Sequence, residues 1–540
     1  MSAGVLSPRT LHRTLVATRP GLVGLAVIIG VGAGIGSVLF HELILGVTWL
    51  VTGREDFSDA GRVASTHLPA LGYWFLLIAP VLGGLVYGPL VQWFAPEARG
   101  HGVPEVMVAV ARRGGRIPAT VAAVKALASG ICIGTGGSVG REGPIVQIGS
   151  ALGSAIGQWL RVPATRLVLM VACGAAGGIS ATFDAPISGV VFGLELILRS
   201  FSAEAFGVLV LSSVTANVVA TVIAGKHSIL TLPHFELGSP VQLPLYALLG
   251  LLAGLLGWAF ARILYAIEDA CDAVWRGPEW LRPAVGGLVL GALLLGLPEM
   301  YGVGYPVLQN AIEGRYVLGF LLLLVLGKIL ASSLTIGIGG SGGVFAPSLF
   351  VGGTAGTAFG VAMDALFPAL HLDPGAFGLV GMAAVFAGAA HAPITAVLIV
   401  FELTGDYALI LPLMAAVVLS TGISHLVSRE NIYTLKLLRR GVDIGADTAV
   451  DEALRWVTVR EVMRPATAGE IAGDTGATGS VDPGTPVHDV LATLAEHRGA
   501  SLAVRDGADG TDGTDGPLLG TIAEHDVLDH LRGAAPAALA

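Results

Sequence analysis

The chain has 540 residues, of which 54% are hydrophobic and only 13% charged, with a formal net charge of -9. Soluble proteins carry about twice that share of charged residues, so the composition excludes an ordinary soluble protein and predicts an integral membrane protein. Much of the negative charge lies after Gly441, and it gives no indication of a nucleic-acid partner.

The predicted membrane domain covers residues 19–440, after a cytoplasmic N-terminal segment at 1–18. Apolar runs such as 21–40 and 376–400 reach the ~20 residues that cross a bilayer. Basic residues flank the domain at both ends. They are Arg9, Arg13, Arg19, Lys436, Arg439 and Arg440. Because basic flanks favour the cytoplasmic side, we expect a multi-pass protein of the plasma membrane with both termini in the cytoplasm. The first run is too long for the core of a signal peptide, so no cleaved leader is expected.

The membrane domain contains an internal repeat. Residues 125–157 and 328–360 agree at 15 of 33 positions without gaps, and residues 184–196 match 391–403. Glycine-rich helices can resemble one another by composition, but here lysine, proline and glutamate also recur in order. We therefore expect repeat one at about 19–225 and repeat two at about 240–440. Duplicated domains with broken helices are typical of transporters, whose binding site lies where the two halves meet.

The segment Gly136–Pro144 is unsuited to a continuous membrane helix, because it carries Arg141 and Glu142. A charge at the centre of a bilayer costs a few kcal/mol or more. Pro144 suits the first turn of a helix, so we predict a buried helix start near Glu142 whose free N–H groups attract anions. Repeat two offers a similar start at Gly343–Pro347 without a charge. Glu142 can occupy the anion site itself and free it when protonated or displaced; the structural alternative is a helix-capping acid.

Three motifs resemble the signatures of the CLC family of chloride channels and proton-coupled chloride transporters. They are GHGVPEV (Gly100–Val106), GREGP (Gly140–Pro144) and GVFAP (Gly343–Pro347). The resemblance covers about residues 19–440. It implies an all-α polytopic fold, with an inverted repeat of broken, tilted helices, and a homodimer with one pore per subunit.

The resemblance also implies roles for single residues. Glu142 corresponds to the gate, and the anion is bound by backbone N–H groups and by the Tyr433 hydroxyl. The backbone groups are those of Gly143, Val344, Phe345 and Ala346. Without the resemblance, Tyr433 is more simply interpreted as an interfacial aromatic residue.

Two positions depart from the family pattern. His101 stands where serine is usual, and we expect it to bind the anion and to add pH dependence, unless its ring turns aside. Leu196 stands where many exchangers have a proton-accepting glutamate. The adjacent Glu195 is matched by Glu402 in the other repeat, which favours a shared structural role for that pair. Since leucine cannot carry a proton, we expect a passive or weakly coupled chloride channel. The alternatives are a chloride/proton antiporter and, more remotely, a membrane-anchored regulatory protein.

The tail, residues 441–540, is predicted to hold one small α/β motif at about 457–533 that resembles a cystathionine-β-synthase (CBS) motif. Two copies could pair across a dimer. Asp526 matches an acid that often binds ribose, while Ala523 replaces the usual hydroxyl-bearing residue. The alternatives are therefore binding of an adenine nucleotide and an interaction or structural role. The acids at 506–516, the pair His41-Glu42 and the three cysteines fit no metal pattern. We expect no metal, no cofactor and no enzymatic activity, with chloride as the ligand.

Overall fold

A computed structural model of the protein describes residues 18–444, apart from 68, 226–229, 231–239 and 406. In the tail it describes residues 457–466, 477, 480–485, 487, 490–491, 494, 501–505, 518–523, 525–527 and 529–530. The chain divides into two compact units, residues 1–442 and 443–540, and each is described by itself.

The first unit is helical. Its helices are α2 (Arg19–Thr52), α3 (Phe75–Phe94), α4 (Val103–Arg112), α5 (Thr120–Gly134), α6 (Glu142–Trp159), α7 (Ala164–Phe183), α8 (Pro186–Phe192), α9 (Ala203–Ala224), α10 (Leu243–Val274), α11 (Arg282–Gly296), α12 (Tyr305–Ile312), α13 (Leu318–Gly337), α14 (Phe345–Leu366), α15 (Pro374–Ala390), α16 (Pro393–Thr404), α17 (Ile410–Val427) and α18 (Thr434–Arg439). Short 3-10 turns join several of them, at Pro69–Trp74, Pro96–Ala98, Pro240–Gln242, Glu279–Leu281, Pro298–Met300 and Pro368–Leu370, and a π-helical turn, η3 (Gly193–Leu198), follows α8.

Within the described part of the chain, nine helices are long and apolar enough to cross a membrane. Large apolar side chains are exposed along several of them, including Leu39 on α2, Val222 on α9 and Leu326 on α13. Such surfaces are expected where helices face lipid rather than water. The sequence-based prediction of a mostly helical, multi-span membrane protein is confirmed.

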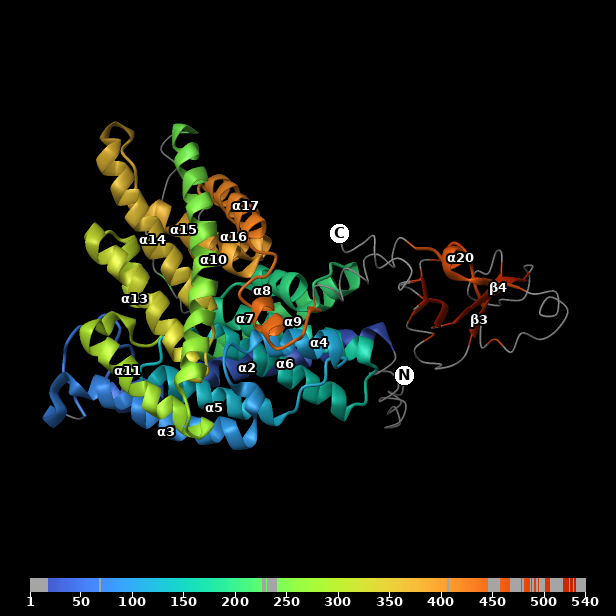
Figure 1. Ribbon diagram of the computed structural model, residues 1–540, viewed down its shortest axis with the longest axis horizontal. Coiled ribbons are helices and arrows are strands. Elements are labelled where there is room, and N and C mark those ends of the chain that lie inside the picture. The colour runs from blue at the N-terminus through green and yellow to red at the C-terminus, as the bar shows by residue number, and fades with distance from the viewer. Residues whose placement is uncertain are drawn as a thin grey trace, which may run out of the picture. The chain divides into compact units, whose positions relative to one another are not determined.

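The internal repeat is visible in the way the helices pack. Helix α6 packs on α7 as α14 packs on α15, and α2 packs on α9 as α10 packs on α17. A Cβ atom at Gly149 would lie 2.1 Å from the Gly174 carbonyl oxygen, and one at Gly352 would lie 2.3 Å from the Gly381 carbonyl oxygen. Glycine thus allows the same close helix contact in both halves. Figure 1 shows the blue to cyan helices of the first half gathered beside the yellow to orange helices of the second half.

Two glutamates cap helices of the opposite repeat. Glu195 in η3 accepts hydrogen bonds from the backbone N–H of Ile394 (3.1 Å) and from the N–H and hydroxyl of Thr395 (2.8 and 2.6 Å), at the start of α16. Glu402 in α16 accepts from the N–H of Ile187 (2.9 Å) and from the N–H (2.7 Å) and hydroxyl of Ser188, at the start of α8. Each carboxylate satisfies N–H groups that a helix start leaves free. The pair therefore has the shared structural role that its repetition in the sequence predicts.

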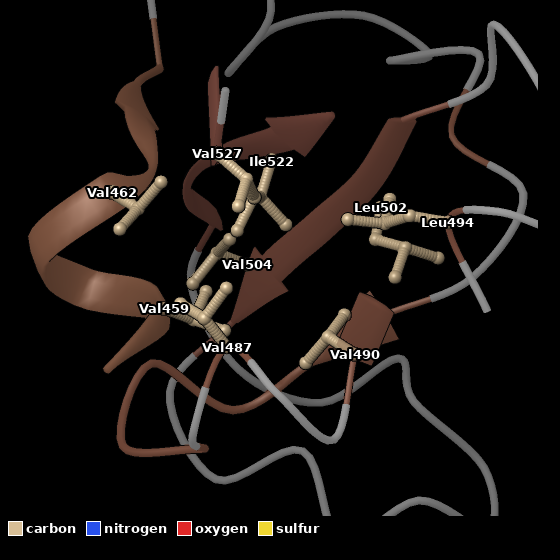
Figure 2. Close-up of a cluster of buried hydrophobic side chains, with 9 residues drawn as sticks. All are labelled: Val459, Val462, Val487, Val490, Leu494, Leu502, Val504, Ile522 and Val527. Atoms are coloured by element: carbon tan, nitrogen blue, oxygen red, sulfur yellow. The ribbon is translucent and has the colours of Figure 1, made fainter. Parts of the chain in front are cut away.

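The second unit contains a small sheet. Its strands are β1 (Arg464–Pro465), β2 (Ser480–Val481), β3 (Ser501–Arg505) and β4 (Leu518–Ala523), in the order β1-β4-β3-β2, with the short helix α20 (Val459–Val462) before β1. Strands β3 and β4 are antiparallel, and β2 runs parallel to β3. A core of nine apolar side chains holds the helix to the sheet: Val459, Val462, Val487, Val490, Leu494, Leu502, Val504, Ile522 and Val527 (Figure 2). The acid-rich run at 506–516 lies outside the described residues.

The reciprocal caps predict a loss of stability on substitution. Glu402→Gln or Glu195→Gln puts an NH₂ group against backbone N–H donors, so each should cost about 1–3 kcal/mol. We expect a lower unfolding temperature for either variant in detergent micelles, measured by the fluorescence of the protein's tryptophans. Glu204→Gln, at an exposed glutamate in the first turn of α9, is the matched control. Unfolding temperatures equal to that of the control would exclude a capping role.

Candidate functional site

The three motif loops are joined by backbone hydrogen bonds. The N–H of Gly140 donates to the Gly343 carbonyl (2.8 Å), and the N–H of Gly343 donates to the Gly140 carbonyl (2.7 Å). The N–H of Gly100 donates to the Gly340 carbonyl, and the N–H of Gly342 donates to the Gly100 carbonyl, each at 3.2 Å. The loops before α4, α6 and α14, far apart in the sequence, therefore form one unit in which the starts of α6 and α14 meet.

Both predicted helix starts are present. Helix α6 begins at Glu142 and α14 at Phe345, with Pro144 and Pro347 in their first turns. The N-cap residues Arg141 and Val344 make no side-chain capping bond among the described residues. All four predicted backbone donors are buried: Gly143, Val344, Phe345 and Ala346. A buried helix start without a side-chain cap carries a partial positive charge and attracts an anion.

The Glu142 carboxylate lies between the two repeats. Glu142 is fully buried, and its Oε1 accepts a hydrogen bond from the Tyr305 hydroxyl at 2.5 Å. Its Oε2 has no hydrogen-bond partner among the described residues. A Cβ atom at Gly140 would lie 2.2 Å from this oxygen and 3.2 Å from the Ala346 nitrogen. The carboxylate of repeat one is therefore placed beside the helix start of repeat two.

Tyr305 is a site residue that the sequence analysis missed. It is the first residue of α12 and follows Gly304, whose φ of 90° is one that glycine adopts readily. The segment 302–306 repeats the Gly-x-Gly-x-Pro spacing of 100–104, and this spacing is the signal that could have revealed it. Tyr305 therefore occupies in repeat two the place that Val103 occupies in repeat one.

Two buried lysines, equivalent in the repeats, hold these loops. Lys125 donates to the carbonyls of Ala98 (2.9 Å) and Gly100 (2.7 Å). Lys328 donates to the carbonyls of Gly302 (3.1 Å) and Val303 (2.8 Å) and to the Ser138 hydroxyl (3.0 Å). Their charges are directed to loop carbonyls that precede α4 and α12. The lysines thus fix the loops that carry His101 and Tyr305.

Two cavities reach the site. One, of about 520 Å³, is lined by Tyr305, Arg141, His41 and Asp184, among others. Arg141 Nη1 lies 2.5 Å from His41 Nδ1, and the Arg141 guanidinium lies 5.8 Å from the centre of the Tyr305 ring. The other cavity, of about 380 Å³, is lined by Gly100, Ile336, five basic side chains and three acidic ones. Polar openings therefore lie next to the Tyr305 end of the site and next to the loop that carries His101.

His101 is buried with an unused side chain. It is 2% exposed, and neither ring nitrogen has a hydrogen-bond partner among the described residues. A Cβ atom at Gly143 would lie 2.2 Å from the His101 carbonyl oxygen, so the two backbones are in contact. The ring lies 6.1 Å from that of Tyr265, measured between centroids. The backbone of His101 therefore lies against the start of α6, while its ring lies near that of Tyr265.

Tyr433 is buried just before α18, in a loop held by repeat two. Its N–H donates to Asn431 Oδ1 (2.8 Å), while Asn431 Nδ2 donates to the Ala390 carbonyl (2.9 Å). The neighbouring Ile432 N–H donates to the Ala389 carbonyl (2.8 Å). The end of α15 therefore fixes the position of Tyr433.

Leu196 is 3% exposed and lies in the π-helical turn η3. Such turns are frequent at functional sites. Its buried side chain nevertheless offers no group that could bind a proton, while the adjacent Glu195 is engaged at the start of α16. Position 196 therefore holds a buried apolar side chain with no titratable group.

Comparison with known proteins identifies the family. Residues 83–425 match the family described as "Voltage gated chloride channel". The chain is 33% identical over 428 residues to the putative chloride channel protein ClcB-like of Ralstonia nicotianae, covering 78% of this chain and 98% of that protein. It is 34% identical over 425 residues to the H(+)/Cl(-) exchange transporter ClcA of Vibrio parahaemolyticus, covering 77% and 89%.

Solved structures show the same fold. A slow cyanobacterial Cl-/H+ antiporter is matched with a TM-score of 0.70 at 24% identity, over 78% of this chain and 98% of that chain. A eukaryotic CLC transporter is matched with a TM-score of 0.63 at 24% identity, over 95% and 88%. The family match, which spans more than half of the chain, together with the extent of the relatives covered, shows that this protein belongs to the CLC family and is a multi-span anion transporter, not an enzyme.

Proposed function

We propose that this protein exchanges chloride for protons across the membrane. The relatives from Vibrio parahaemolyticus and Vibrio cholerae, at 34% and 35% identity, are named H(+)/Cl(-) exchange transporters. Their names support the antiporter over the passive or weakly coupled channel that the sequence analysis favoured. That preference rested on Leu196 alone, and one missing acid does not remove every proton carrier from the protein.

The observation that carries the proposal is the buried Glu142 carboxylate beside Ala346, held by the Tyr305 hydroxyl. In this position the carboxylate takes the place of an anion at the start of α14. Two negative charges at one buried site repel each other strongly, so chloride and the ionised carboxylate exclude each other. Protonation removes the charge of Glu142 and lets chloride occupy the site. One group then both gates the anion and carries a proton.

Chloride in this site is bound by backbone donors and two side chains. We assign the donors to the N–H groups of Gly143, Val344, Phe345 and Ala346, all buried at the two helix starts. The Tyr433 hydroxyl and the His101 ring complete the site. Neutral donors bind chloride without the strength of a full cation, which permits rapid release.

The wider organisation is proposed from the same resemblance. We assign residues 1–18 and 441–540 to the cytoplasm and 19–440 to the plasma membrane, with inverted repeats at about 19–225 and 240–440. We also infer a homodimer with one pore in each subunit.

For the tail we propose a single CBS-like motif, at about 457–533, that pairs across the dimer. The Asp526 carboxylate accepts hydrogen bonds from the Ala523 N–H (2.9 Å) and from Arg464 Nη2 (3.0 Å). Because both oxygens are engaged within the tail, a structural or interaction role is favoured over binding of an adenine nucleotide.

Flux measurements test the exchange. In liposomes, a chloride gradient should drive protons in the opposite direction, in a ratio that stays fixed as the gradient changes. Glu142→Gln cannot take up the proton, so we expect it to retain chloride flux and to lose proton movement. Chloride and pH electrodes recorded together give both rates. Chloride flux without proton movement in the unaltered protein would overturn the antiporter proposal and restore the channel.

Tyr305→Phe tests the contact that holds the gate. The substitution removes the donor to Glu142 and keeps the aromatic ring. A hydrogen bond to a charged group contributes about 1.5–3 kcal/mol, which corresponds to roughly 10- to 150-fold, so the carboxylate should leave more readily and chloride turnover should rise by about tenfold or more. Tyr316→Phe makes the same change at a tyrosine whose hydroxyl pairs with Asn310 instead. Equal turnover in both variants would mean that Tyr305 does not hold the gate.

A further inference from the structure

An exchanger needs a route for the proton on the side of the site away from Glu142. Position 196 does not supply a titratable group, because Leu196 is apolar and buried. Its neighbour Glu195 accepts three hydrogen bonds at the start of α16 and is thereby committed to the fold. If the proposed exchange is correct, on which this inference rests, another titratable group can supply that route.

His101 has the features that such a group requires. It is almost fully buried, and both ring nitrogens lack a hydrogen-bond partner among the described residues. A buried polar group left unpaired is costly, so such a group commonly has a function that the protein alone does not complete. Its backbone contacts Gly143, the residue after Glu142. The loop that carries it also borders the cavity of about 380 Å³, through Gly100.

Charged groups face His101 from several elements. Lys125 on α5, Lys436 on α18 and Arg440 just after α18 all act on its ring. Each of these cations already has partners. Lys125 donates to the carbonyls of Ala98 and Gly100. Lys436 forms an ion pair with Glu268, and Arg440 forms one with Glu105. Tyr265 on α10 approaches the ring with its own ring. The charged groups that act on the His101 ring are therefore cations, and two of them are paired with acids.

We propose that His101 binds the transported proton together with chloride. Chloride that comes from the Glu142 side reaches the ring, a ring nitrogen takes one proton from the opposite side, and the resulting N–H donates to the anion. The imidazolium and the chloride cancel in charge, so both occupy the site without adding net charge. The proton then passes on to Glu142, the ring returns to its neutral form, and the chloride leaves towards the side from which the proton came. Proton and chloride therefore cross this part of the pathway in opposite directions.

The cationic surroundings explain why the two ions would be coupled. A lone imidazolium beside three cations is disfavoured, whereas chloride next to the ring offsets the added charge. By linkage, chloride must then strengthen proton binding, and protons must strengthen chloride binding by the same factor. A serine at this position could donate to chloride but could not couple it to a proton.

Chloride binding at different pH values tests this linkage directly. Because Glu142 itself competes with chloride, the measurement uses Glu142→Gln as the background, by calorimetry in detergent micelles. We expect chloride affinity to strengthen as pH falls, by up to about tenfold per pH unit, the limit for one linked proton. In Glu142→Gln/His101→Ser the affinity should be independent of pH. His101→Asn, which also cannot be protonated, should behave in the same way if the serine variant folds poorly.

His425→Ser is the matched control, because His425 is another histidine of the membrane unit, stacked on His391. Combined with Glu142→Gln, it should retain the full pH dependence. An affinity independent of pH in Glu142→Gln alone would overturn the proposal. So would a pH dependence that survives the loss of the His101 ring.

Transport separates this inference from the proposed function. His101→Ser should lower the number of protons moved per chloride to near zero, while His101→Ser/Leu196→Glu, which adds an acid in η3, should raise it again. If the unaltered protein moves no protons, the exchange itself is overturned. If it does move them and His101→Ser keeps the same ratio, exchange stands and the role of His101 is overturned.

Discussion

The structure of the site depends on the pair of hydrogen bonds between Gly140 and Gly343. These bonds join the loops before α6 and α14 and satisfy their backbone groups inside the protein. They leave the N–H groups at the two helix starts without side-chain caps. Buried N–H groups without partners are costly, and an anion or the Glu142 carboxylate can satisfy them. The loop pairing thus creates an anion site whose positive potential comes from the backbone.

The buried lysines fit this arrangement, although buried cations near an anion pathway can trap the anion. Lys125 and Lys328 are both fully buried, yet each directs its ammonium group to loop carbonyls. Each ammonium group is hydrogen-bonded to the loop that it fixes, although the charge of Lys125 still acts on the His101 ring. A conductor needs binding weak enough for release, and this use of lysine meets that need.

The helix starts could be predicted from the sequence, because charges at membrane depth and the positions of Pro144 and Pro347 leave few alternatives. Tyr305 could not be predicted from the sequence in this way, because its hydroxyl contacts Glu142 from 163 residues further along the chain. Only the Gly-x-Gly-x-Pro spacing relates its segment, 302–306, to the motif at 100–104. The repetition of Glu195 and Glu402 predicted a shared role, but not that each caps a helix of the other repeat. The names of the exchanger relatives favour the antiporter over the channel, a preference that had treated one apolar position as decisive for a property of the whole pathway.

The turn η3 explains why the proton carrier would lie elsewhere in this protein. Leu194, Leu196 and Ile197 are all buried there, and the one acid of the turn, Glu195, is bound to α16. A proton path through η3 would need water or a titratable chain inside an apolar segment, which is unfavourable. A histidine beside the anion site removes that need, because the positive charge of its protonated ring is offset by the chloride bound next to it. Placing the titratable group at His101 lets η3 serve only the contact between the two repeats.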